Sequence, residues 1–150
     1  MPSRVYRVLV DTNVALDLLL ARQPFVNDAL QLFALGEAGR AQLLLSTDAI
    51  STIFFVVSKN QNAATAREAI CKLLDLVGLA ALDERAVLRG MSLDFEDIED
   101  ALVAAVAEKE GVDLIVTRNQ KDFKNSPVPV MAPAAFLALA SVAGQEAGEE

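Results

Sequence analysis

The chemistry available to this chain depends on carboxylates, because the sequence has 21 acidic residues and no histidine. The absence of histidine removes the commonest general base, the histidine-dependent catalytic triads and the histidine-containing zinc sites. Asp97 and Asp100 stand three positions apart, so on a helix their Cβ atoms would lie about 5–6 Å apart on one face. Two ionised carboxylates at that separation repel each other unless a cation lies between them. The spacing therefore indicates a divalent-metal site.

The same segment also has a simpler interpretation. Acidic residues in the first turn of a helix favour its N-terminal dipole, and acidic clusters are usually solvated surfaces. On that interpretation Asp94 and Glu96 start the helix and Glu99 faces water. The turn Asp11-Thr12-Asn13, which follows a valine-rich run, is likewise more often an ordinary helix cap than a site.

The elements that must position these carboxylates alternate between strand and helix. Apolar runs predict short strands at residues 5–10, 42–45, 114–116 and 128–131, with a further short apolar segment at 79–82. Helical spacing predicts helices at residues 14–20, 26–35, 50–57, 63–77, 83–89, 97–110 and 134–142. This alternation predicts an α/β fold with a mostly parallel sheet of about four to five strands, covered by helices on both faces.

Ligands of open α/β sheets bind beyond the carboxyl ends of the strands, near the point where the strand order reverses. The first predicted strand ends at Asp11, and Asn119 and Asp122 follow the strand at residues 114–116. We therefore expect these two polar turns to converge, with Asp97 and Asp100 contributed by the helix at residues 97–110.

Length and composition bound the organisation of the chain. With 150 residues, 53% of them hydrophobic, we expect one domain over residues 1–143, followed by an acidic, disordered tail over residues 144–150. No apolar run approaches the roughly 20 residues of a membrane span, and no signal peptide is recognisable, so we expect a cytoplasmic protein with its last helix docked on the core. The single cysteine, Cys71, is expected to be a buried thiol.

The formal net charge of −8 argues against a surface that binds nucleic acid by broad phosphate neutralisation, which needs clustered Lys and Arg. It does not exclude an enzyme that engages a short stretch of nucleic-acid backbone, because a bound metal ion supplies positive charge at the point of reaction.

Three motifs in this order, Asp11-Thr12-Asn13, residues 97–102 and residues 115–123, resemble the PIN-domain family of metal-dependent ribonucleases. That family includes the toxin of many bacterial toxin–antitoxin pairs, and the resemblance runs from residue 5 to about residue 137. It implies a three-layer α/β/α domain that holds one or two Mg²⁺ or Mn²⁺ ions at one end of the sheet. Asp11 and Asp100 match the family's ligands, with Asp97 as a ligand or water-orienting base and Asn119 at a fourth polar position.

The resemblance also suggests supporting residues and one departure. Thr12, Asn13 and Thr117 would orient the carboxylates, Asp122 is a further candidate ligand, and Arg118, Lys121 and Lys124 would meet substrate phosphates, unless they are ordinary solvated charges. The helix after the second strand usually offers an acid, where this chain has Thr52. Asp48 stands four residues earlier and would replace the missing carboxylate.

The sequence therefore predicts a Mg²⁺- or Mn²⁺-dependent endoribonuclease that resembles a toxin. Its expected partners are RNA, an antitoxin protein and a second copy of the chain. The main alternative is a catalytically degenerate PIN-like module that binds RNA or a protein partner, because Thr52 brings no charge. A phosphotransfer domain with Asp11 as nucleophile is a third hypothesis, although the chain lacks the second aspartate that one common class of such enzymes carries two residues later.

Overall fold

The computed structural model describes residues 4–148 and, for residues 143–148, the backbone alone. Its sheet has five strands in the order β3-β2-β1-β4-β5, and every pairing between them is parallel. The strands are β1 (Tyr6–Val10), β2 (Ala41–Ser46), β3 (Gly78–Ala80), β4 (Leu114–Val116) and β5 (Val130–Met131). The predicted parallel sheet and its number of strands are confirmed.

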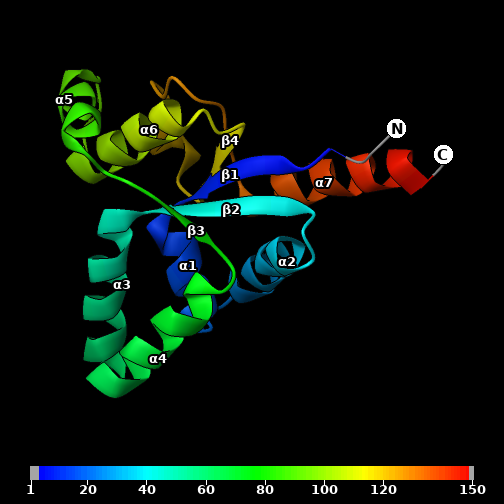
Figure 1. Cartoon of the computed structure of the whole chain (residues 1–150), viewed down its shortest axis with the longest axis horizontal. Helices are drawn as coiled ribbons and strands as arrows, with labels where there is room; N and C mark the ends of the chain where they lie inside the picture. Colours follow the sequence, from blue (N-terminus) through cyan, green and yellow to red (C-terminus); the bar gives the residue numbers. More distant parts are fainter. Residues whose placement is uncertain (1–3, 149–150) are drawn as a thin grey trace.

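Helices cover both faces of this sheet, as Figure 1 shows. One face carries α1 (Thr12–Leu19), α2 (Val26–Glu37), α3 (Thr47–Asn60), α4 (Ala63–Leu74) and α7 (Pro133–Gly148). The other carries α5 (Glu84–Ser92), α6 (Ile98–Glu110) and the short 3-10 helix η1 (Gln120–Phe123). The predicted three-layer α/β/α architecture is therefore confirmed.

Alternation along the central strands divides the core in two. Val8, Val10 and Val116 pack on the face covered by α1, whereas Leu9 and Ile115 pack on the face covered by α6. Successive side chains of a strand point to opposite faces, and here both faces are covered. The central strands are therefore continuous apolar runs instead of alternating ones.

The strand order reverses between β1 and β4. The chain steps from β1 to β2 and β3 on one side, then returns across the sheet through α6 to place β4 on the other side of β1. Asp11 N donates to Val116 O (2.9 Å), which joins the carboxyl ends of the two strands. This edge is the position at which open α/β sheets bind their ligands.

The start of α6 differs from the prediction. Asp97 is the N-cap, and its side chain accepts hydrogen bonds from Glu99 N (2.7 Å) and Asp100 N (3.4 Å). A capping carboxylate satisfies amide groups that have no partner within the helix. The prediction that Asp97 lies inside the helix, with Asp94 and Glu96 at its start, is wrong, because both of these precede the cap.

Other elements begin or end away from their predicted bounds. The strand β5 is shorter than predicted because Pro127 and Pro129 have no N–H to donate to a ladder. The last helix, α7, docks on the core through Phe136, as expected, and its backbone runs past the predicted end at Val142 to Gly148. Within residues 4–148, no helix is both long and apolar enough to cross a membrane.

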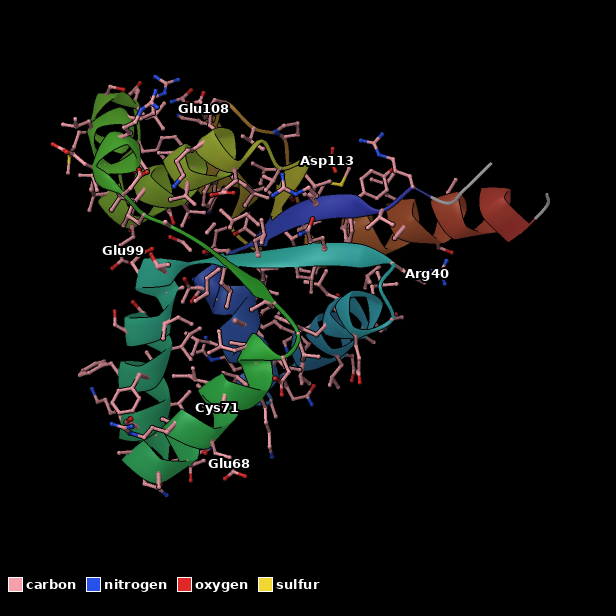
Figure 2. All side chains as sticks on the ribbon, in the orientation of Figure 1. Arg40, Glu68, Cys71, Glu99, Glu108 and Asp113 are labelled. Carbon is pink, nitrogen blue, oxygen red and sulfur yellow. The ribbon has the colours of Figure 1, made fainter. Side chains whose placement is uncertain are left out.

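The thiol of Cys71 is exposed, so the predicted burial is wrong. Helix α4 turns Ala66, Ile70 and Leu73 toward the core. Cys71 follows Ile70 directly and therefore lies about 100° further around the helix, on its outer face (Figure 2).

Candidate active site at the carboxyl edge of the sheet

The carboxyl group of Asp11 is buried at the end of β1. Asp11 is 5% exposed and is the N-cap of α1. Its side chain does not cap the helix but meets Thr117, the residue after β4, whose Oγ1 donates to Asp11 Oδ2 (2.7 Å). Burial raises the pKa of Asp11, against the opposing effects of the Thr117 hydroxyl and the Arg118 charge. The predicted role of Thr117 as a residue that orients Asp11 agrees with this contact.

Asp100 lies beside a cleft at the start of α6. The cleft has a volume of about 800 Å³, and Asp94, Phe95, Asp97, Lys121 and Asp122 are among its lining residues. Partial burial raises the pKa of Asp100 to about 7, assisted by the negative charges of Asp11, Asp97, Asp122 and Glu99. Four carboxylates from three separate segments therefore act electrostatically on Asp100.

We call Asp11, Asp97, Glu99, Asp100 and Asp122 the acidic edge. Within the described part of the chain, none of them forms an ion pair with Lys or Arg. No three Asp, Glu or Cys side chains among residues 4–142 are arranged to hold a metal ion. The charge and the oxygen ligands fit a hard divalent cation such as Mg²⁺.

The predicted phosphate-binding residues separate into two groups. Lys121 and Lys124 line the cleft beside Asp100. Arg118 does not line it, because its guanidinium group bonds to the buried carboxylate of Asp17 and packs on the ring of Phe25. The structure thus places two of the three cations directly at the cleft.

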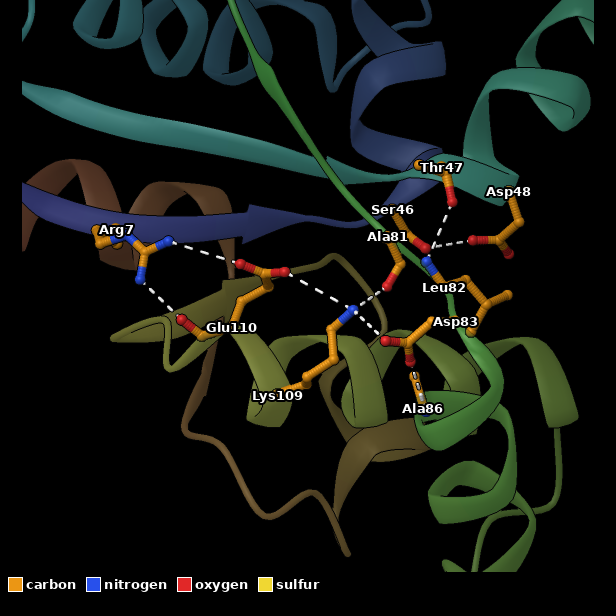
Figure 3. Close-up of polar contacts among 10 residues, drawn as sticks. All are labelled: Arg7, Ser46, Thr47, Asp48, Ala81, Leu82, Asp83, Ala86, Lys109 and Glu110. Atoms are coloured by element: carbon orange, nitrogen blue, oxygen red, sulfur yellow. Dashed lines mark hydrogen bonds and ion pairs between the residues drawn. The ribbon is translucent and has the colours of Figure 1, made fainter.

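The helix after β2 contributes less than predicted. Thr52 is exposed on α3, and the Asp48 carboxylate accepts a hydrogen bond from the Ser46 hydroxyl (Figure 3). Neither residue lines the cleft, and Asp48 is not among the carboxylates that raise the pKa of Asp100. Asp48 and Thr52 therefore do not share the cleft with Asp100.

The remaining candidates lie on the two turns at the switch point. Thr12 and Asn13 form the first turn of α1 and are half-buried. Asn119 is also half-buried, and its N–H donates to Thr117 Oγ1 (3.1 Å). Asp122 lies in η1, and its N–H donates to Asn119 O (3.0 Å). The turn after β4 is therefore tied to Asp11 through the hydroxyl of Thr117.

The electrostatic effect of Glu99 and the pairing of Asp17 were not predicted from the sequence. Glu99 was expected to face water; it is exposed, yet its charge raises the pKa of both Asp11 and Asp100. Figure 2 labels it at the start of α6. Asp17 is buried in α1, and its position within an apolar run was a signal that it pairs with a cation inside the protein.

Comparisons with known proteins agree with this arrangement. A family model described as the PIN domain matches residues 7–121. The chain is 29% identical over 134 residues to Ribonuclease VapC1 from Aquifex aeolicus (strain VF5), covering 87% of this chain and 92% of that protein.

Solved structures give the same result for the fold. A toxin–antitoxin complex from Klebsiella pneumoniae matches with a TM-score of 0.64 and 26% identity, over 84% of this chain and 97% of that chain. DNA-bound VapBC from Salmonella typhimurium matches with a TM-score of 0.68 and 14% identity, over 86% and 99%. The strand order, the acidic edge and the extent of the family match lead to one conclusion: this chain belongs to the PIN-domain family.

Proposed function

We propose that this protein is a Mg²⁺- or Mn²⁺-dependent endoribonuclease that cleaves RNA at the acidic edge. The observation that carries the proposal is the concentration of carboxylates around Asp100, whose negative charges add to the effect of partial burial and raise its pKa to about 7. A purely structural role for Asp100 would favour a paired or solvated carboxylate with an ordinary pKa. Its place at the switch point of a PIN domain, and the similarity to Ribonuclease VapC1, support hydrolysis of RNA.

The carboxylates have different proposed roles, which depend on their positions. Asp11 and Asp100 are the proposed metal ligands, and Asp97 binds the same ion or orients water while it also caps α6. A divalent ion held there would polarise the phosphodiester and acidify an attacking water molecule. The Thr117 hydroxyl fixes one oxygen of Asp11, and Thr12, Asn13 and Asn119 complete the polar surroundings. Asp122 is a further candidate ligand beside the cleft.

The cleft next to Asp100 is the proposed path of the RNA. Lys121 and Lys124 line it and would contact backbone phosphates, which provide most of the affinity in sequence-independent binding. Because the whole chain carries a net charge of −8, binding depends on such local cations and on the metal. We expect weak RNA binding when no divalent cation is present.

The proposed biological role is that of a toxin controlled by an antitoxin protein. The support is the 26% identity to a chain of the Klebsiella pneumoniae toxin–antitoxin complex over 84% of this chain. Homodimer formation and a cytoplasmic location are parts of the same proposal. A small DNA-binding protein encoded next to this chain would support it further.

The proposal is tested by incubating purified protein with RNA in Mg²⁺, in Mn²⁺ and in EDTA. We expect cleavage with either metal and none in EDTA. The Asp11→Asn/Asp100→Asn double variant should be inactive, whereas Asp75→Asn, which neutralises an exposed aspartate at the end of α4, should remain active. Cleavage that persists in the double variant would reject this site.

A catalytically silent PIN-like module that binds RNA or a protein partner is the second candidate. It is favoured by exposed Thr52, which brings no carboxylate, and by the engagement of Asp48 with Ser46. Unfolding followed during a Mn²⁺ titration separates the two candidates, because a ligand that binds only the folded state must stabilise it. No stabilisation at millimolar Mn²⁺ would favour the silent module.

A further inference from the structure

A buried ion pair connects α1 to the turn after β4. Asp17 is 1% exposed, and its carboxylate accepts hydrogen bonds from Arg118 Nε (2.6 Å) and Arg118 Nη2 (3.1 Å). Arg22 lies 3.8 Å from the same carboxylate. Two parallel N–H donors from one guanidinium group fix its orientation as well as its position.

An aromatic ring holds the flat face of the same guanidinium group. Arg118 Cζ lies 3.9 Å from the centre of the Phe25 ring, within the distance of a cation–π contact. Asp17 occupies the Nε–Nη2 edge, and Nη1 donates no hydrogen bond within the described residues. The Arg118 side chain remains 23% exposed. The Nη1 group of a firmly held arginine is thus left to donate to an external acceptor.

The position of this arginine relates it to the acidic edge. Arg118 directly follows Thr117, whose hydroxyl donates to Asp11, and the positive charge of Arg118 acts on the Asp11 carboxyl. Lys121 and Lys124 lie at the cleft beside Asp100, which Arg118 does not line. Arg118 therefore provides positive charge on the Asp11 side of the site, apart from the lysines of the cleft.

We propose that Arg118 is a prearranged contact for a backbone phosphate of the RNA substrate, and that Asp17 is the positioning residue that holds it. This inference rests on the proposed function. A planar guanidinium group suits phosphate oxygens, and a side chain held in advance loses little conformational freedom on binding. Phe25 is 38% exposed and supports the guanidinium group from its face.

Two variants distinguish a positioning role from simple electrostatics. Arg118→Gln removes the phosphate contact, whereas Asp17→Asn removes a negative charge and leaves the arginine. If only the total charge mattered, Asp17→Asn would tighten RNA binding. If Asp17 positions Arg118, Asp17→Asn weakens binding although the protein has become less negative. The sign of the change is therefore the decisive measurement.

Binding is measured by fluorescence anisotropy with a labelled single-stranded RNA oligonucleotide in millimolar Ca²⁺, with electrophoresis to verify that the RNA stays intact. We expect Arg118→Gln to raise Kd by about tenfold, as for a lost hydrogen bond to a charged group. The slope of log Kd against log salt should fall by about 0.7, as for one single-strand phosphate contact. Arg40→Gln is the matched control, because it removes an exposed arginine near the amino end of β2, and it should change Kd by less than about twofold.

A double-mutant cycle shows whether Asp17 acts through Arg118. Asp17→Asn should raise Kd in the native background and leave Kd unchanged in the Arg118→Gln background. In the double variant both side chains are neutral, so the Asp17 charge is not left buried without Arg118. Phe25→Leu provides a second test, because it removes the aromatic ring under Arg118 but keeps an apolar side chain there. It should weaken binding by about two- to fivefold, only when Arg118 is present. Circular dichroism verifies that each variant is folded.

The possible outcomes separate the inference from the proposed function. If the native protein cleaves RNA but Arg118→Gln binds RNA as well as Arg40→Gln does, the phosphate contact is overturned and the proposed function is not. Tighter binding by Asp17→Asn overturns the positioning role of Asp17. A native protein that neither binds nor cleaves RNA overturns the proposed function and, with it, this inference.

Discussion

The strands β1 and β4 carry charged groups at both ends, and the two ends are organised in opposite ways. At the amino end, Asp113 accepts hydrogen bonds from Arg7 N (2.8 Å) and Arg4 Nη2 (3.0 Å). Arg7 also donates to Glu110 O (2.8 Å) and pairs with the Glu110 carboxylate. At the carboxyl end, the acidic edge has no cation paired with it among the described residues.

Through Glu110 and Lys109, the charges at the amino end connect to Asp83, which follows the carboxyl end of β3 (Figure 3). Lys109 bonds to Ala81 O and lies 3.5 Å from the carboxylate of Asp83. We call Arg7, Asp83, Lys109, Glu110 and Asp113 the paired network. A hydrogen bond from Ala86 N, together with Lys109, lowers the pKa of Asp83, whereas the surroundings of Asp100 raise its pKa. The same residue type thus stabilises one region and repels its neighbours in the other.

This contrast indicates different uses for the two regions. Charges that serve the fold have their partners within the protein, so ionisation favours the folded state. At the acidic edge the pKa values of Asp11 and Asp100 are raised, so ionisation of these two carboxyl groups works against folding. Carboxylates collected at a cost to stability are typical of functional sites.

The largest expected effect is on catalysis. Asp100→Asn should reduce RNA cleavage in Mg²⁺ by more than about 100-fold, because Asp100 is a proposed metal ligand. Loss of a residue that only hydrogen-bonds to a metal ligand already reduces activity by up to about 100-fold. Asp83→Asn makes the same substitution in the paired network and should leave the rate of cleavage nearly unchanged. Initial rates on one RNA substrate test both variants. Equal losses in the two variants would contradict the division between the regions.

Metal binding should stabilise the native protein through the acidic edge. Mn²⁺ at a hundredfold excess over its Kd should add about 2.7 kcal/mol to the free energy of unfolding, visible as a rise in Tm. Asp100→Asn should lose most of this gain, whereas Asp113→Asn should keep it. A Tm rise that is the same in both variants would place the metal elsewhere.

Without metal, the same Asp→Asn change should have opposite effects at the two ends. Asp100→Asn relieves repulsion and should stabilise the metal-free protein by about 1 kcal/mol at pH 8, after allowance for solvent screening. Asp113→Asn weakens hydrogen bonds to Arg4 and Arg7 and should destabilise it by about 1 kcal/mol. Urea unfolding in EDTA measures both. Destabilisation by both variants would mean that the acidic edge is also a structural network.

The dependence of stability on pH should separate the regions by sign. Folding raises the pKa of Asp100 from 3.8 to about 7, so the folded state binds more protons and its stability falls as pH rises through this window. Asp83 has a lowered pKa, so its contribution is present above its unfolded pKa and is lost as pH falls through the folded value. Metal-free unfolding followed across pH should show the decrease from Asp100 disappear in Asp100→Asn. A decrease that is unchanged in that variant would assign it to other groups.

Much of the architecture followed from the sequence because it depends on local patterns. The apolar runs of β1 and β4 end at Asp11 and Thr117, and the parallel arrangement brings those ends together. Asp11, which was expected to lie near Asp100, is close enough for its charge to raise the pKa of Asp100. The burial of both faces of the central strands followed from their continuous apolar composition.

The details that escaped prediction depend on contacts between distant segments. The bond from Arg118 to Asp17 joins residues far apart in the sequence, so no local pattern predicted that this arginine is held away from the cleft. Asp97 is the cap because its side chain accepts a hydrogen bond from a first-turn amide of α6. The spacing of the acidic residues did not show which of them would be the cap. On α4, Ile70 is buried and the next residue, Cys71, is exposed, so an error of one position in the helical pattern reverses the predicted burial.

The smallest expected effect concerns the lysines that border the acidic edge. Lys121 lines the cleft, so Lys121→Gln should raise KM for RNA by about threefold and leave kcat nearly unchanged, because one exposed cation adds a modest, salt-sensitive term to binding. Lys72→Gln is the matched control, since Lys72 lies on α4 in an exposed pair with Glu68. High salt should remove the difference between the two variants, because exposed charges are screened. A loss of kcat in Lys121→Gln would instead mean that this lysine acts on the reacting phosphate itself.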